Sequence, residues 1–237
     1  MAVRTQRFTG FPPGGFEFFL ELQAHQSRDW FQTNKQRYET LWVRPLEALL
    51  EDLTGRLSDV FPEMPNARRH IFRIQRDIRF SADKSPYKTH IAGHVPVAPT
   101  TESEGHGWTP SLYTHFSLDW SGMSMGNWMV DKEVLLRFRE RVAEDKTGAL
   151  LQRTIERLEQ DGFQLSQHET FKRVPAPYPQ DHPRADLLKR KDLGMNVEIP
   201  EDHMARPDLL DWLDERMHKL SAIGVWLLDN LRPAASA

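Results

Sequence analysis

The sequence predicts an α+β fold, in which a central, mostly antiparallel sheet is flanked by N-terminal, middle and C-terminal helices. Two observations lead to this prediction. Apolar residues recur at helical spacing near both ends of the chain and after residue 131, whereas in the middle they alternate with polar residues. Because no repeat or linker divides the chain, we expect one domain over residues 1–237, with frayed ends at residues 1–10 and 233–237.

The N-terminal region is expected to be helical. A turn at residues 11–15 precedes a first helix. The apolar side of that helix is expected to contain Phe16, Phe19 and Leu20. Ser27 has the side chain of an N-cap residue, so a second helix is predicted over residues 28–61. Pro45 should kink or restart it, because proline lacks the N–H group that a helix interior requires.

The middle of the chain shows the alternation that is typical of strands. The three clearest segments are residues 70–80, 87–97 and 111–120. A polar loop at residues 99–109 separates the second segment from the third. The Ser121-Gly122 pair is expected to form a hairpin turn that leads into a further strand at residues 123–129.

Helical spacing returns after Asp131. It predicts two helices that break near Thr147-Gly148, followed by an irregular, proline-rich stretch at residues 162–191. A last helix is predicted from about residue 207 to residue 231.

Composition excludes several function classes. The chain has no cysteine, so it has no disulfide, thiolate nucleophile or cysteine-ligated metal site. A net charge of −3 and a pI near 6.4 give no overall reason to expect nucleic acid or an acidic membrane surface. We find neither a signal-like N-terminus nor an apolar run that could span a bilayer, so we expect a cytoplasmic protein with no membrane contact.

Charge is nevertheless concentrated in one segment. Residues 68–94 contain seven Lys or Arg residues and two Asp residues. Within this segment Arg73, Asp77 and Arg79 share the polar side of the predicted strand, where Asp77 could hold either guanidinium group. Arg76 instead interrupts the apolar side, and we expect its guanidinium group to meet a carboxylate or backbone carbonyl groups.

We interpret this segment as a pocket for a small anion that carries phosphate or carboxylate, because guanidinium groups bind both. The predicted ligand-binding residues are Arg73, Arg76, Asp77, Arg79, Asp83, Lys84, Tyr87 and Lys189. Lys189 belongs to a second basic cluster, which could fold over the first as a lid. Whether a reaction follows stays open, and Tyr87 and His115 are the candidate proton donors. An internal salt-bridge network is the competing interpretation.

The same segment resembles a known family. Its residues run Arg-Ile-Gln-Arg-Asp-Ile-Arg-Phe-Ser-Ala-Asp-Lys-Ser-Pro-Tyr from Arg73 to Tyr87. This run resembles the motif of a conserved bacterial and fungal family of unknown function, DUF2461. Further similar features are Trp30-Phe31, Asn34-Lys35, Tyr38, residues 126–129, Asp181-His182-Pro183 and residues 188–191. The resemblance covers nearly the whole chain and implies family membership, but it implies no activity.

Other site chemistries are less well supported. His90 and His94 share a strand side but lie roughly 13 Å apart along it, so one metal ion could not easily use both. We therefore expect no metal and no cofactor. A nucleic-acid or protein binding module that uses the same basic surface is the alternative from another function class. The sequence does not indicate an oligomeric state.

Overall fold

The structure is a computed structural model that describes residues 7–79, 82–98, 108–128, 130–167 and 170–233. Within these residues, six strands form one antiparallel sheet in the order β1-β2-β3-β4-β6-β5. The strands are β1 His70–Ile71, β2 His90–Pro96, β3 Ser111–Ser117, β4 Ser121–Asn127, β5 Gln164–Leu165 and β6 Leu193–Glu198. The predicted α+β fold with an antiparallel sheet is confirmed.

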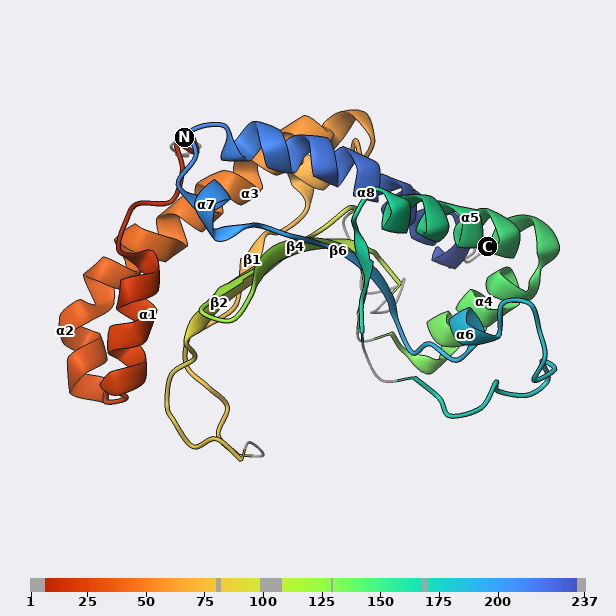
Figure 1. Cartoon of the computed structure of the whole chain (residues 1–237), viewed down its shortest axis with the longest axis horizontal. Coiled ribbons are helices and arrows are strands. Elements are labelled where there is room, and N and C mark those ends of the chain that lie inside the picture. Colours follow the sequence, from red (N-terminus) through yellow and green to blue (C-terminus); the bar gives the residue numbers. More distant parts are fainter. Residues whose placement is uncertain (1–6, 80–81, 99–107, 129, 168–169, 234–237) are drawn as a thin grey trace.

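Helices lie mainly on one face of this sheet. They are α1 Gly15–Ala24, α2 Arg28–Tyr38, the π-helical turn η1 Glu39–Val43, α3 Arg44–Arg56, the 3₁₀ turns η2 Leu57–Asp59 and η3 Met64–Asn66, α4 Lys132–Ala143, α5 Asp145–Gln160, α6 Ala185–Leu188, α7 Glu201–Met204 and α8 Leu209–Leu231. Figure 1 shows the sheet as an arch, with α3 and α8 above it and the lower face between α1 and α2 at one end and α4 and α6 at the other.

The two faces of the sheet differ in composition. The side chains that alternate toward α3 and α8 are apolar and buried, among them Ile91, Val95, Leu112 and Phe116. On the opposite face the strand register places one row of polar and aromatic residues across the sheet. In order of the strands, this row is His70, His94, Tyr113, Ser124, Asn196 and Gln164.

The N-terminal helices largely follow the sequence. The Ser27 hydroxyl caps α2 by accepting the N–H of Trp30 at 3.2 Å, and the π-helical turn that precedes Pro45 marks the predicted interruption. The predicted apolar side of α1 is corrected, because Leu20 is 56% exposed. The buried side chains are instead Phe18, Phe19 and Leu22, since α1 docks through Phe19, which stacks on Trp42 at 4.9 Å between ring centroids.

The predicted strand at residues 70–80 is mostly absent. In the described part of this segment, the regular strand covers His70–Ile71, and beyond it pairing continues through the Phe72 N–H to the Ala92 carbonyl and an isolated bridge between Gln75 and Tyr87. Ile78 is 43% exposed, so the apolar alternation at this end of the segment does not mark a buried side. The last predicted residue, Phe80, lies outside the described residues.

Several elements also begin or end at residues other than those predicted from the sequence. The turn between β3 and β4 lies at residues 118–120, and Ser121-Gly122 opens β4, where the Trp120 indole packs directly on Gly122. Strand β6 was not predicted.

The first described residues also differ from the expectation. Phe8, in the segment expected to fray, is buried, and its N–H donates to Asp52 at 2.8 Å. Residues 1–6, 234–237 and most of the predicted 99–109 loop lie outside the described residues. None of the described helices has the length and apolar character needed to cross a membrane.

Candidate functional site

The predicted site lies mostly in the segment that joins β1 to β2, residues 72–88, which we call the basic hairpin. Figure 1 shows it as the yellow loop that hangs below one end of the sheet. Its two arms stay paired beyond β1, because the N–H of Arg76 donates to the Pro86 carbonyl at 2.9 Å and the N–H of Lys88 donates to the Ile74 carbonyl at 2.9 Å. The arms therefore hold Arg73, Arg76 and Lys88 close together.

The tip of the hairpin satisfies much of its own charge. The Arg79 guanidinium group donates to both carboxylate oxygens of Asp77, at 3.0 and 2.7 Å, as the sequence suggested. These hydrogen bonds lower the pKa of Asp77. Lys84 donates through Nζ to the Ile78 carbonyl at 2.8 Å. The tip residues are exposed, and their contacts shape the turn.

Arg76 has the partners that its position predicted. A guanidinium nitrogen of Arg76 lies 3.0 Å from a carboxylate oxygen of Asp83 and donates to the Tyr87 carbonyl at 3.4 Å. Its Nε is buried and has no hydrogen-bond partner in the described part of the chain. Asp83 also accepts the N–H of Ser85 at 2.8 Å, which lowers the pKa of its carboxyl group.

Tyr87, a predicted ligand-binding residue and candidate proton donor, is part of the core. The residue is only 5% exposed, and its ring stacks on Phe31 of α2 at 4.5 Å between centroids. The Gln26 amide holds the backbone from both sides, by accepting the Tyr87 N–H at 3.0 Å and donating to the Tyr87 carbonyl at 3.2 Å. Tyr87 thus anchors the hairpin to the N-terminal helices.

Lys189 is not brought together with the other predicted residues. It caps the C-terminal end of α6 and pairs with Asp186 at 2.9 Å. Figure 1 shows α6 at the opposite end of the arch from the basic hairpin. The predicted lid is therefore corrected, because the second basic cluster packs against the α4 end of the molecule.

A groove of about 780 Å³ adjoins the hairpin. It runs between α2, η1 and α3 on one side and residues 69–75 on the other. Its apolar floor includes Phe31, Tyr38, Leu50, Ile71 and Ile74, and its charged rim consists of Lys35, Glu39, Arg44, Glu47, Glu51, Arg69 and Arg73. The sequence analysis missed this groove, although Phe31, Lys35 and Tyr38 have the spacing of one helix face.

The rim contains two arginines without ion-pair partners. Lys35 lies 3.6 Å from Glu39, and Arg69 lies 2.8 Å from Glu51. Arg44 and Arg73, in contrast, form no hydrogen bond or ion pair with their side chains among the described residues. Arg73 thus lines the groove without a direct partner among the described residues, and its charge, after the hydrogen bonds of Arg79, also lowers the pKa of the Asp77 carboxyl group.

Cations accumulate where the hairpin meets the sheet. We call Arg73, Arg76 and Lys88 the basic edge. Burial lowers the pKa of Lys88, and the charges of Arg73 and Arg76 lower that pKa further. Lys88 was counted in the sequence but was not chosen as a ligand residue. The signal that could have indicated it is its position two residues before His90, on the same side of the β2 segment.

His115, a candidate proton donor, lies beside His90 on the open sheet face. The two ring centroids are 4.6 Å apart, and the Tyr113 hydroxyl lies 3.2 Å from His115 Nδ1. Burial lowers the pKa of His115. Burial, followed by the neighbouring charges of His115, Lys88 and Arg76, lowers the pKa of His90 to about 4. Both imidazoles are therefore neutral near pH 7.

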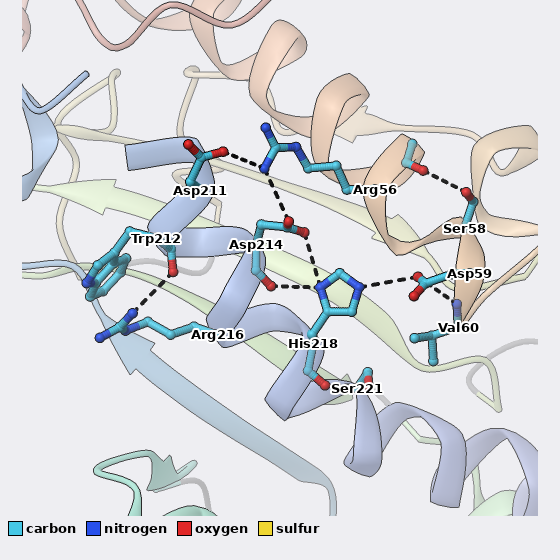
Figure 2. Close-up of polar contacts among 11 residues, drawn as sticks. Arg56, Ser58, Asp59, Val60, Asp211, Trp212, Asp214, Arg216, His218 and Ser221 are labelled. Carbon is cyan, nitrogen blue, oxygen red and sulfur yellow. Dashed lines mark hydrogen bonds and ion pairs between the residues drawn. The ribbon is translucent and has the colours of Figure 1, made fainter. Parts of the chain in front are cut away.

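A second polar cluster links α8 to the end of α3 (Figure 2). Arg56 contacts Asp211 at 2.7 Å and Asp214 at 3.2 Å, and His218 lies between Asp214 and Asp59, with its Nε2 3.2 Å from Asp59. The nearby Ser58 and Ser221 hydroxyl groups donate to backbone carbonyls. No serine nucleophile thus faces His218 in Figure 2, and the cluster joins two helical segments.

Metal chemistry gains no support from the described residues, among which no group of three or more His, Cys, Asp or Glu side chains could hold an ion.

Comparison with known proteins gives one family. The model of the conserved hypothetical protein family DUF2461 matches residues 15–226. This chain belongs to that family. No curated protein and no solved structure matches the chain. The DUF2461 match includes α2, the groove and the basic hairpin, so it covers every residue of the candidate site.

Proposed function

We propose that this member of the DUF2461 family binds a small anionic ligand, which carries a phosphate or carboxylate group, at the basic edge formed by Arg73, Arg76 and Lys88. The observation that supports the proposal most directly is the unbalanced charge of this edge. Asp83 pairs with Arg76, whereas Arg73 and Lys88 form no ion pair with any described residue. An anion would supply the missing countercharge.

Two further features favour the same place. Arg76 Nε is a buried donor without a partner in the described part of the chain, so a bound anion could accept its hydrogen bond. Arg73 is exposed and lines the groove, so its guanidinium group is accessible to a ligand. We place this binding in the cytoplasm, the compartment that the sequence led us to expect.

The proposal is tested by the thermal stability of the protein in inorganic phosphate. Phosphate should raise the melting temperature relative to chloride at the same ionic strength, because a ligand that binds only the folded state stabilises it, by about 2.7 kcal/mol at a hundred times Kd. Arg73→Gln should abolish this shift and leave the unliganded melting temperature nearly unchanged, since Arg73 is exposed and unpaired in the described structure.

Arg141→Gln is the matched control. Arg141 is half-exposed on α4 and contacts Glu144 at 3.3 Å, so its loss should leave the phosphate response intact. If Arg73→Gln instead strongly destabilised the unliganded protein and wild type did not respond to phosphate, the segment would be a structural salt-bridge network.

A further inference from the structure

The open face of the sheet carries an unusual concentration of rings. Five of them form a connected group that we call the ring face, and they are Phe72, His90, His94, Tyr113 and His115. All five side chains are partly or substantially exposed, and Phe72 is 37% exposed. In Figure 1, α3 and α8 lie on the other side of the sheet.

The rings lie against one another across neighbouring segments. Phe72 stacks on His94 with 5.5 Å between centroids and 18° between planes, and it lies 6.5 Å from Tyr113. Tyr113 is 6.4 Å from His115, which in turn lies 4.6 Å from His90. The result is a connected run of rings that extends from Phe72 over β2 and β3.

This surface is uncharged near neutral pH. Burial lowers the pKa of His94 and of His115, and burial together with nearby positive groups lowers the pKa of His90 to about 4. Neutral rings of this kind suit stacking with a flat, uncharged partner group.

Positive charge adjoins the ring face at the end where His90 lies. Lys88 precedes His90 by two strand residues, which corresponds to about 7 Å, and Arg76 is close enough to lower the pKa of His90. The strand residues on this face include no Lys or Arg. A ligand that fits both features has one anionic end and one planar end.

A polar group lies farther along the same face. The Ser124 and Ser166 hydroxyl groups both donate to Oδ1 of Asn196, at 2.6 and 3.3 Å. The amide nitrogen of Asn196 then makes no hydrogen bond with the described residues, so two donors stay available for ring nitrogens or carbonyl oxygens of a ligand.

We infer that the ligand is a nucleotide, whose base stacks on the ring face while its phosphate occupies the basic edge. This inference rests on the proposed function, because the phosphate uses the same cations. A single strand of nucleic acid is a poorer match, since it would need cations along its whole track. The aromatic rings are what distinguish a nucleotide from a bare phosphate or a sugar phosphate.

The test compares dissociation constants measured by calorimetry for the four nucleoside monophosphates, ribose 5-phosphate, inorganic phosphate and a short oligothymidylate. The tightest nucleoside monophosphate should bind on the order of tenfold more tightly than ribose 5-phosphate, because stacking of one base on aromatic side chains has about that effect. Phe72→Leu should remove most of this advantage and leave the phosphate affinity unchanged.

Two variants control for the substitution itself. Phe72→Tyr keeps a ring and should keep the nucleotide preference, so it separates stacking from a folding defect. Phe171→Leu makes the same change at a Phe that is 39% exposed and contacts Arg139 and Lys191 instead, and it should have no effect.

The outcomes separate the two proposals. Equal affinity for nucleotides and ribose 5-phosphate would overturn the nucleotide inference and leave anion binding supported. No binding of any phosphate compound would overturn both. Oligothymidylate binding that is tighter than mononucleotide binding and falls steeply with salt would replace the nucleotide with a nucleic-acid strand.

Discussion

At Tyr87 a single aromatic ring joins the basic hairpin to the N-terminal helices. The ring stacks on Phe31, and the Gln26 amide binds both backbone groups of the same residue. A hairpin whose tip makes mostly local contacts needs such an anchor, because the two-residue strand β1 gives it little support from the sheet. Tyr87 therefore positions the basic edge from outside it.

This role predicts different effects for two substitutions. Tyr87→Ala should lower the free energy of unfolding by about 3–5 kcal/mol, because it removes a buried ring and leaves a cavity. Tyr87→Phe keeps the ring and should change stability by less than about 1 kcal/mol, with the phosphate response retained. Urea unfolding and phosphate titration of both variants measure this. If Tyr87→Phe lost the phosphate response at normal stability, its hydroxyl group would belong to the binding site.

Helices could be predicted from the sequence more reliably than the elements around the site. Helical spacing, Ser27 and Pro45 are local signals, and local contacts satisfy them. The strand prediction for residues 70–80 was mostly wrong, because alternation alone does not reveal whether a tertiary partner covers the apolar side. Strand β6 pairs with β4 and β5, which are distant in sequence, so six residues gave no clear signal.

The candidate site was predicted in part for the same reason. The Asp77–Arg79 and Arg76–Asp83 contacts lie within one hairpin, and the sequence was enough to suggest a fork at Asp77 and a carboxylate for Arg76. The groove needs the packing of α2 and α3 against residues 69–75, and the ring face needs the register of β2 and β3. Neither the helix packing that forms the groove nor the strand register that forms the ring face can be predicted from the spacing of residues along the chain.

The junction between α4 and α5 illustrates how a glycine was misinterpreted. The helix break was predicted at Thr147-Gly148, but it lies at Glu144, between the two helices. Gly148 sits in the first turn of α5, where it lies directly against the Val142 carbonyl oxygen. The buried Arg184 also donates to the carbonyl groups of Val142 and Ala143, at 2.6 and 2.9 Å, and so caps α4.

Two glycine substitutions should therefore have opposite effects. Gly148→Ala would force a methyl group into the Val142 carbonyl and displace Arg184, so we expect a loss of about 3 kcal/mol in the free energy of unfolding. Gly55→Ala, at an exposed position of α3 with no atom within 4 Å of the added methyl group, should increase stability by about 0.5–1 kcal/mol. Chemical denaturation measures both, and a neutral Gly148→Ala would contradict the close approach.

Across the whole molecule, the contacts in Figure 2 fix α8 to the end of α3 on top of the sheet. His218 is the titratable centre of this connection. Burial alone would lower the pKa of His218, but its hydrogen bonds to the Asp214 carbonyl and Asp59, together with the charges of both carboxylates, raise that pKa above the ordinary value. The protonated form is therefore favoured in the folded state.

This shift gives the stability of the protein a defined pH dependence. Because the folded-state pKa is raised, the contribution of His218 is complete below about pH 6.5, the unfolded value, and is lost as pH rises through the folded value. His218→Gln should then destabilise the protein more at pH 6 than at pH 8.5 in urea unfolding. His203→Gln is the control, because His203 on α7 contacts only its sequence neighbour Asp202 among the described carboxylates. If the loss of stability caused by His218→Gln instead grew as the pH rose, the stabilising contacts of His218 with Asp214 and Asp59 would be contradicted.

The two ends of the sheet have a consequence for how the folded protein behaves in a crowded solution. The edge strands β1 and β5 contain only two residues each, so each of them offers few aligned backbone groups to another chain. Long, regular edges are the places where proteins polymerise strand by strand or capture an extended peptide. The short edge strands of this sheet disfavour both polymerisation and peptide capture. They therefore lower the risk of aggregation for a sheet that has an open aromatic face.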